Sequence, residues 1–204
     1  MELEDASIAV ALDAVSAATK TLSEKLSPTP TEHPKVRAAA YDPVLIASQD
    51  AVDATKHVID ELVAEGVNQA DKRVQSLQIT RTAVSYDMIS WRIGRNRVLS
   101  GVRDGALLDS RVVAKPHRSK KADVEKVEKE EGAGRKLARL REKVVLYDST
   151  LQSLDSIKEL PGVVADTKFL QEIEAKYNYF RALKCVYALS QIVSSLIPCI
   201  DALQ

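Results

Sequence analysis

Apolar side chains recur along this chain at alternating steps of three and four residues, the spacing that aligns them on one face of an α-helix. Between residues 3 and 26 this row consists of Ile8, Leu12, Val15, Thr19, Leu22 and Leu26. After a proline-rich interruption, which we expect to be a loop running through His33-Pro34, a second row consists of Leu45, Ser48, Val52, Thr55, Ile59 and Leu62. Asp42 as an N-cap with Pro43 in the first helical position predicts the start of this second helix, and Gly66 suits its C′ position.

Three further rows predict three more helices. From about residue 70 to 99 the row is Val74, Leu77, Arg81, Val84, Met88, Trp91, Arg95 and Val98, ended by Gly101 and Gly105. From about residue 135 to 160 it is Leu137, Leu140, Val144, Tyr147, Leu151 and Leu154, with a sharp stop at Leu160-Pro161-Gly162. After Asp166, an expected N-cap, it is Leu170, Ile173, Tyr177, Phe180 and Tyr187, until Pro198 ends or kinks the helix. Arg81 and Arg95 occupy apolar positions, so each either extends to the edge of the buried face or faces a partner or RNA.

Together these patterns predict an all-α protein, because no segment keeps a period of two for long. Short connections favour antiparallel helical hairpins, arranged as a bundle or as a degenerate tetratricopeptide-like array. We expect a three-helix part at 1–100, a linker at 101–134 and a C-terminal hairpin at 135–204 that packs on the first part. The linker contains a basic stretch without periodicity, interpreted as a disordered loop, and a mixed-charge run that is either a helical extension or disordered.

Composition narrows the class of protein. Seven glycines and seven prolines in 204 residues indicate few turns and long elements. No apolar run approaches the ~18 residues of a membrane span, and the acidic start does not resemble a secretory signal. Two cysteines, Cys185 and Cys199, indicate a reducing compartment and ordinary buried thiols.

Catalytic and metal chemistry find little support in the sequence. Asp53, His57 and Asp60 can share one helix face, but without a second histidine nearby a charge-paired surface is the better interpretation than a metal site. Cys185 lies among apolar residues, which indicates a core position, and no serine stands in a nucleophile motif. Gly132-Ala133-Gly134 lacks the preceding strand of a phosphate-binding loop. We therefore predict no catalytic residue, no cofactor and no metal, and interpret the chain as an interaction protein.

Local basicity is the clearest candidate chemistry, although 29 basic and 29 acidic residues cancel overall. Five cations without an intervening acid occupy the linker: Arg111, Lys115, Arg118, Lys120 and Lys121. Further cations gather at 135–143 and at 92–103. This arrangement predicts contact with an RNA phosphate backbone, weakened by salt through counterion release. The alternative is a solubilising loop balanced by the acids at 125–131; no aromatic residue in the loop is available for base stacking.

Aromatic residues concentrate in the last helix, which holds Tyr177, Tyr179, Phe180 and Tyr187. Core packing against a neighbouring helix is the first interpretation of this pattern. The alternative is a partner face at Tyr177, Phe180 and Tyr187, which would be left uncovered if a further helix were missing.

One stretch resembles a known family. The motifs that carry the resemblance, in order, are Tyr147-Asp148, Leu151-Gln152-Ser153-Leu154, Glu159-Leu160-Pro161-Gly162, Asp166, Phe169-Leu170, Glu172-Ile173, Phe180, Ala182, Cys185 and Tyr187. Together they look like the eukaryotic signal recognition particle subunit of about 68 kilodaltons, with Ile93, Arg95 and Asn96 agreeing more loosely. The firm match covers about a quarter of the chain. We expect the chain to begin beyond that family's RNA-binding domain and to stop before its companion-binding segment, with a tail at 192–204 that departs from the family.

The resemblance implies a non-catalytic, tetratricopeptide-like scaffold. It implies association with 7S RNA, pairing with a companion subunit of about 72 kilodaltons, and cotranslational protein targeting to the endoplasmic reticulum without membrane insertion. It further implies the ribosome and the signal recognition particle receptor as partners, and a cytoplasmic location with assembly in the nucleus and nucleolus. A helical protein–protein adaptor unrelated to RNA is the alternative function.

Overall fold

The computed structural model describes residues 2–26, 33–106 and 133–201, and within these ranges every regular element is helical. The α-helices are α1 (Glu2–Leu26), α2 (Pro34–Ala39), α3 (Asp42–Ala64), α4 (Lys72–Ser100), α5 (Ala133–Lys158) and α6 (Thr167–Asp201). Two 3₁₀ turns, η1 (Val102–Gly105) and η2 (Val163–Ala165), follow α4 and α5. The all-α prediction is confirmed.

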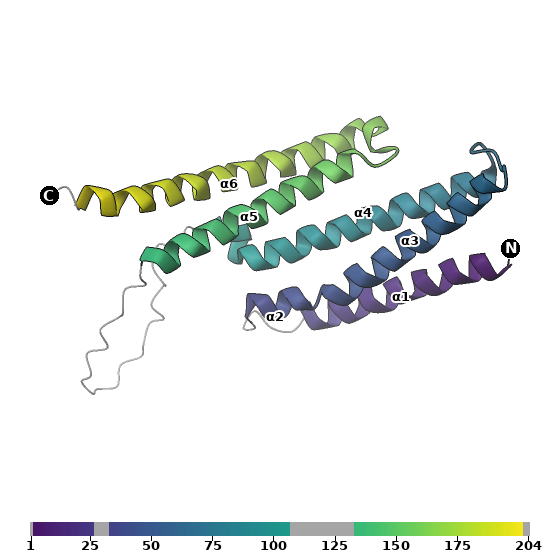
Figure 1. Cartoon of the computed structure of the whole chain (residues 1–204), viewed down its shortest axis with the longest axis horizontal. Helices are drawn as coiled ribbons and strands as arrows, with labels where there is room; N and C mark the ends of the chain where they lie inside the picture. Colours follow the sequence, from purple (N-terminus) through teal and green to yellow (C-terminus); the bar gives the residue numbers. More distant parts are fainter. Residues whose placement is uncertain (1, 27–32, 107–132, 202–204) are drawn as a thin grey trace.

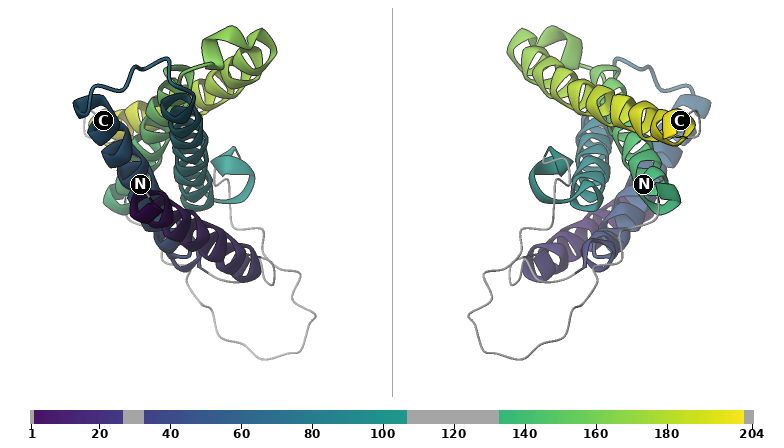
Figure 2. Two further views of the ribbon diagram at one scale, coloured as in Figure 1. Left: turned by 90° about the vertical axis from the view of Figure 1, so that its right-hand side faces the viewer. Right: turned by 90° about the vertical axis from the view of Figure 1, so that its left-hand side faces the viewer.

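The long helices run alternately up and down and lie in the order of the chain, α1 beside α3, α3 beside α4, α4 beside α5 and α5 beside α6 (Figure 1). Viewed along the helices, α4 lies between the α1–α3 side and the α5–α6 side (Figure 2). The boundary expected at residue 100 therefore falls at the end of a helix that both sides share. None of the described helices is long and apolar enough to cross a membrane.

Both described hairpin turns follow the local chemistry of the sequence. After α3, Gly66 adopts a φ of 83° and donates to the carbonyl of Val63, while Val67 donates to that of Leu62, which together form a Schellman motif. After α5, Gly162 adopts a φ of 86°, and Asp166 accepts hydrogen bonds from the backbone of Lys168 and Phe169, as an N-cap should.

Three boundary predictions are corrected. His33-Pro34 is not loop but the start of α2, because the His33 side chain accepts from the Lys35 amide and proline presets the first helical φ. Asp42 is not the N-cap of α3; a tight turn from α2 makes Tyr41 the cap, and Asp42, inside the helix, pairs with Arg95 at 3.3 Å. Of the two outcomes expected at Pro198, an end of the helix is wrong: α6 continues to Asp201, since proline removes only one amide donor near a helix end.

The apolar rows form the core as predicted. Members of all five rows are buried, among them Leu22, Leu62, Val74, Leu154 and Ile173. Arg81 and Arg95 are half-buried, and Arg95 reaches Asp42 at the edge of the packed face, which is the first of the two outcomes expected for it.

Candidate nucleic-acid interface

The chain bends sharply at residues 101–105, which we call the elbow, just before the segment that carries the predicted basic loop. Arg103 and Asp104 adopt left-handed φ angles of 51° and 57°. This conformation costs a non-glycine residue about 1–2 kcal/mol. The elbow therefore depends on contacts that compensate for its strain, a feature that often accompanies functional sites.

Side chains of α5 and α6 supply those contacts. The hydroxyl of Tyr147 donates to the Asp104 carbonyl at 2.7 Å, and that of Tyr187 donates to the Gly105 carbonyl. Lys143 donates to the carbonyl of Ser100 at 3.0 Å and to the Tyr187 hydroxyl at 3.3 Å. Burial raises the pKa of Tyr147, which keeps its hydroxyl a donor. The elbow is thus fixed to both helices of the C-terminal hairpin.

Gly105 is required at the end of the elbow. Its φ is 74°, and a Cβ atom there would lie 2.6 Å from the Tyr147 hydroxyl oxygen and 2.8 Å from the Ser100 carbonyl oxygen. Only glycine lets the backbone approach Tyr147 closely enough for the hydrogen bond that Asp104 accepts.

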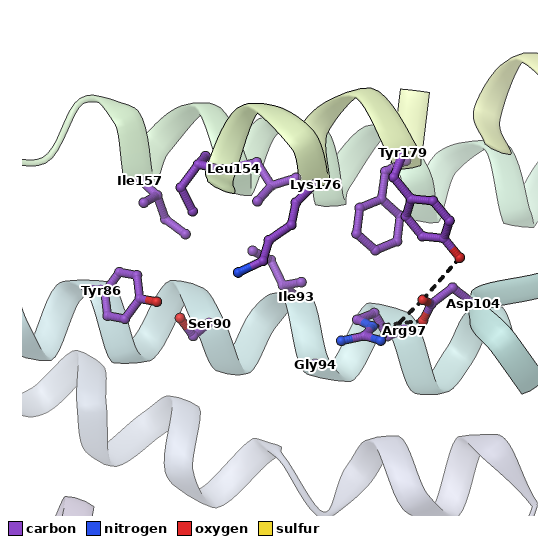
Figure 3. Close-up of a pocket in the computed structure, with 12 residues that line it drawn as sticks. Tyr86, Ser90, Ile93, Gly94, Arg97, Asp104, Leu154, Ile157, Lys176 and Tyr179 are labelled. Atoms are coloured by element: carbon purple, nitrogen blue, oxygen red, sulfur yellow. Dashed lines mark hydrogen bonds and ion pairs between the residues drawn. The ribbon is translucent and has the colours of Figure 1, made fainter. Parts of the chain in front are cut away.

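Beside the elbow, α4 and the α5–α6 hairpin enclose a cleft of about 380 Å³ (Figure 3). Its floor is apolar and consists of Ile93, Leu154, Ile157, Ile173 and Phe180. Its rim is polar and aromatic and consists of Tyr86, Ser90, Arg97, Asp104, Lys176 and Tyr179. An apolar floor with a few polar groups around it is the usual composition of a ligand site.

One hydrogen-bonded group forms the rim nearest the elbow. Asp104 accepts from Arg97 Nε at 2.8 Å and from a terminal guanidinium nitrogen at 3.2 Å, and Tyr179 donates to the same carboxylate at 3.4 Å. The hydrogen bond with Asp104 raises the pKa of Arg97; burial, followed by the charge of Asp104, raises the pKa of Tyr179. The guanidinium plane and the Tyr179 ring, which is 43% exposed, are therefore both held in place at the cleft mouth.

The residues predicted to contact RNA phosphates, Arg111, Lys115, Arg118, Lys120 and Lys121, lie outside the described residues. The end of η1 and the start of α5, which flank these residues in the sequence, lie at the same end of the molecule (Figure 1). The first turns of α5 present the exposed cations Arg135, Lys136 and Arg141. Arg97, counted among the cations by sequence, has its charge balanced by Asp104.

The predicted partner face is largely covered by the chain itself. Phe180 and Tyr187 are only 5% and 3% exposed, and Lys158 lies 4.2 Å from the ring centroid of the half-buried Tyr177. Their rings pack against α5, so core packing, the first interpretation, describes them. The exposed apolar row of α6 is instead Val186, Leu189, Ile192, Val193 and Leu196. Cys185 is exposed on this side as well, so its assignment to the core is wrong: its helix position faces away from α5.

His57 lies on an exposed face of α3 and pairs with Glu61 at 3.2 Å, while Asp53 accepts from Gln49. Among the described residues no group of three or more histidine, cysteine or acidic side chains could hold a metal ion.

The sequence did not single out the cleft. Ser90, Lys176 and Asp104 belong to three different elements, so no spacing within one helix relates them. Gly101 and Gly105 mark the two ends of the elbow in the sequence. The contact between Asp104 of the elbow and Arg97 becomes apparent only from the fold.

Comparison with known proteins agrees with the resemblance and extends it from about a quarter of the chain to nearly its whole length. A family model described as RNA-binding signal recognition particle 68 matches residues 1–199. The match includes residues 192–199, so the expected departure of the tail from the family is not supported for these residues. The chain is also 26% identical over 192 residues to the signal recognition particle subunit srp68 of Schizosaccharomyces pombe, covering 84% of this chain and 27% of that protein. No solved structure matches the chain. Because one family model spans nearly all of its length, this chain belongs to the RNA-binding signal recognition particle 68 family.

Proposed function

We propose that the chain is a non-catalytic scaffold segment of a signal recognition particle subunit, associated with 7S RNA in cotranslational targeting to the endoplasmic reticulum. The observation that carries the proposal is the match of residues 1–199 to a family described as RNA-binding. The all-helical array supports a scaffold role, since its paired helices present long faces on both sides of α4. We also propose a cytoplasmic site of action with nuclear and nucleolar assembly.

The RNA contact that we propose is electrostatic and involves Arg111, Lys115, Arg118, Lys120 and Lys121. The elbow and the start of α5, which flank this segment in the sequence, lie at one end of the array, where α5 presents the exposed cations Arg135, Lys136 and Arg141. Cations that neutralise phosphates of a backbone release counterions from it, so such a contact weakens as the salt concentration rises.

A filter-binding titration with 7S RNA over a salt series tests this contact. The variant carries glutamine at all five cations of the segment. The matched control carries glutamine at five exposed lysines of the other elements, Lys20, Lys25, Lys35, Lys56 and Lys72. We expect the variant to bind more weakly than the control and with a shallower salt dependence, by about 0.9 in log–log slope for each phosphate that the variant no longer neutralises. Equal affinities and slopes would contradict the assignment of these residues.

We further propose that the full protein pairs with the companion subunit of about 72 kilodaltons and works with the ribosome and the signal recognition particle receptor. A pull-down of recombinant companion by this chain, with and without 7S RNA, measures whether the described helices take part. Capture that depends on 7S RNA indicates a bridge through RNA, whereas capture without it indicates direct contact.

A helical adaptor that acts through protein contacts alone is the second candidate. The exposed apolar row Val186, Leu189, Ile192, Val193 and Leu196 favours it, because exposed apolar surface of this kind often marks a protein contact. The two candidates differ in the titration with 7S RNA: the adaptor predicts binding no stronger than that of a neutral helical bundle.

A further inference from the structure

We propose that the cleft between α4 and the α5–α6 hairpin receives one unpaired nucleotide of the bound RNA. In this arrangement the base lies over the apolar floor against Tyr179 and Arg97, and Lys176 contacts the adjoining phosphate. The inference rests on the proposed RNA-binding function and specifies how part of the RNA is recognised.

The size and lining of the cleft suit a single nucleotide. About 380 Å³ lies at the lower end of the range of small-molecule sites, and is too small for a duplex. Ile93, Leu154 and Phe180 provide an apolar floor drawn from three helices. Proteins read RNA largely through unpaired bases, which leave the stack and lie against aromatic rings or arginine planes.

The rim presents two planar groups that are already ordered. Two hydrogen bonds from Arg97 to Asp104 fix the guanidinium plane, and the third, from Tyr179, limits rotation of its exposed ring. Ordering these groups before binding lowers the entropy lost when a base stacks on them. Tyr179 thus has a polar anchor and a packing partner in Phe180, with 5.1 Å between the ring centroids, and it remains 43% exposed.

The charges at the rim suit an anionic ligand. Asp104 is neutralised by Arg97, whereas Lys176 is exposed and extends from α6 toward α4 across the cleft (Figure 3). The balance at the rim is therefore one net positive charge, which matches one phosphate.

The cleft adjoins the elbow. Asp104 belongs both to the cleft rim and to the elbow, and the segment with the five cations starts directly after the elbow. Lys143, which donates to the Ser100 carbonyl beside the elbow, belongs to the same helix as the exposed cations Arg135, Lys136 and Arg141. This positive charge near the cleft favours a nucleotide over a side chain of a protein partner.

Four variants of the whole chain test the proposal, with two RNAs measured at several salt concentrations: 7S RNA and a fully paired RNA hairpin. For 7S RNA we expect Tyr179→Leu to weaken binding about tenfold at every salt concentration, since stacking is not screened, while Tyr179→Phe stays close to the wild type. Lys176→Gln should weaken binding and lower the salt slope by about one, whereas Lys168→Gln, an exposed lysine of α6 outside the cleft, should change neither. On the paired hairpin Tyr179→Leu should have no effect.

The outcomes separate the two proposals. If Tyr179→Leu binds 7S RNA like the wild type, or loses the same affinity for the paired hairpin, the nucleotide cleft is wrong and the proposed RNA-binding function stands. If the wild type binds neither RNA, both proposals fail. Thermal unfolding of each variant, expected within about 2 °C of the wild type because these side chains are surface-exposed, excludes a loss of fold as the cause.

Discussion

The two sides of α4 are held together in different ways. Toward the N-terminus, three separate clusters join α1, α3 and α4, centred on Val58 and Val74, on Leu22 and Val44, and on Ala51 and Val84. Toward the C-terminus, a single continuous cluster joins α4, α5 and α6 and includes the rings of Tyr147, Phe180 and Tyr187. One side is therefore a series of small, mostly aliphatic clusters, one of which includes the rings of Tyr41 and Trp91, and the other is one larger core.

The two sides of α4 also differ in the polar contacts that join their elements. On the C-terminal side Asn96 donates to Ser149 at 3.1 Å, Lys158 pairs with Glu174 at 2.9 Å, and tyrosines hold the elbow. On the N-terminal side α3 and α4 are linked by Asp42 and Arg95. Aliphatic contacts tolerate small shifts between helices, whereas hydrogen bonds require one register. The cleft lies on the side whose register is fixed, where a recognition site has to be rigid.

The largest expected effect comes from removing a core leucine on each side. Leu154 and Leu22 are both almost fully buried, so Leu154→Ala and Leu22→Ala should each lower the free energy of unfolding by about 2–5 kcal/mol in chemical denaturation. Because Leu154 belongs to the continuous core, its replacement should raise hydrogen exchange across α4, α5 and α6. Because Leu22 belongs to a small cluster, its replacement should raise exchange mainly in α1 and at the start of α3. Global exchange in both variants would show that the two sides unfold as one unit.

Gly105→Ala tests the elbow and should lower the free energy of unfolding by about 3 kcal/mol, from backbone strain together with the loss of hydrogen bonds at Tyr147. Gly162→Ala is the control, because Gly162 also has a positive φ but no atom within 4 Å of the position that a Cβ would take. It should cost about 1–2 kcal/mol from the φ alone. Similar losses in both variants would mean that the close approach at the elbow contributes little.

Tyr147→Phe removes one hydrogen bond from the elbow and should cost about 1 kcal/mol near neutral pH. The folded pKa of Tyr147 is raised by burial, so the neutral hydroxyl contributes stability below the unfolded pKa of about 10, and this contribution falls as the pH rises above it. Urea unfolding from pH 8 to 11 should therefore show a steeper loss above pH 10 for the wild type than for Tyr147→Phe. Parallel curves would show that another group governs alkaline stability.

The sequence predicts the helices well on both sides of α4 but does not predict the cleft, because helices depend on local patterns and the cleft depends on contacts between elements. Periodic burial is a local property, so rows such as those through Leu62 and Leu154 predict the core correctly on both sides of α4. Asp166 and Gly66 act within a few residues of their positions and are also predicted correctly. The core position predicted for Cys185 is wrong because its apolar neighbours in the sequence are distributed around the helix and do not form one face. The cleft depends on Tyr179 meeting Asp104 across 75 residues, and on Arg97 meeting Asp104 across the bend that ends α4, and helical periodicity encodes neither contact.

The smallest expected effect compares the helix caps. Asp71 accepts from the Arg73 amide at the start of α4, and Asp166 accepts from two amides at the start of α6. Asp71→Ala and Asp166→Ala should each lower the free energy of unfolding by about 1 kcal/mol, and the loss should be larger for Asp166 because two donors lose their partner.

One of the two donors at Asp166 is the amide of Phe169, whose ring lies edge-on to Tyr86 with 5.6 Å between centroids. Loss of the Asp166 cap should therefore reach the cleft: NMR should show increased exchange at residues 167–170 together with a shift of the Tyr86 ring signals. Asp71→Ala should leave the Tyr86 ring signals unchanged. The start of α4 packs through Val74 into an aliphatic cluster on the N-terminal side. A Tyr86 ring that responds to neither variant would show that loss of the Asp166 cap does not reach the cleft.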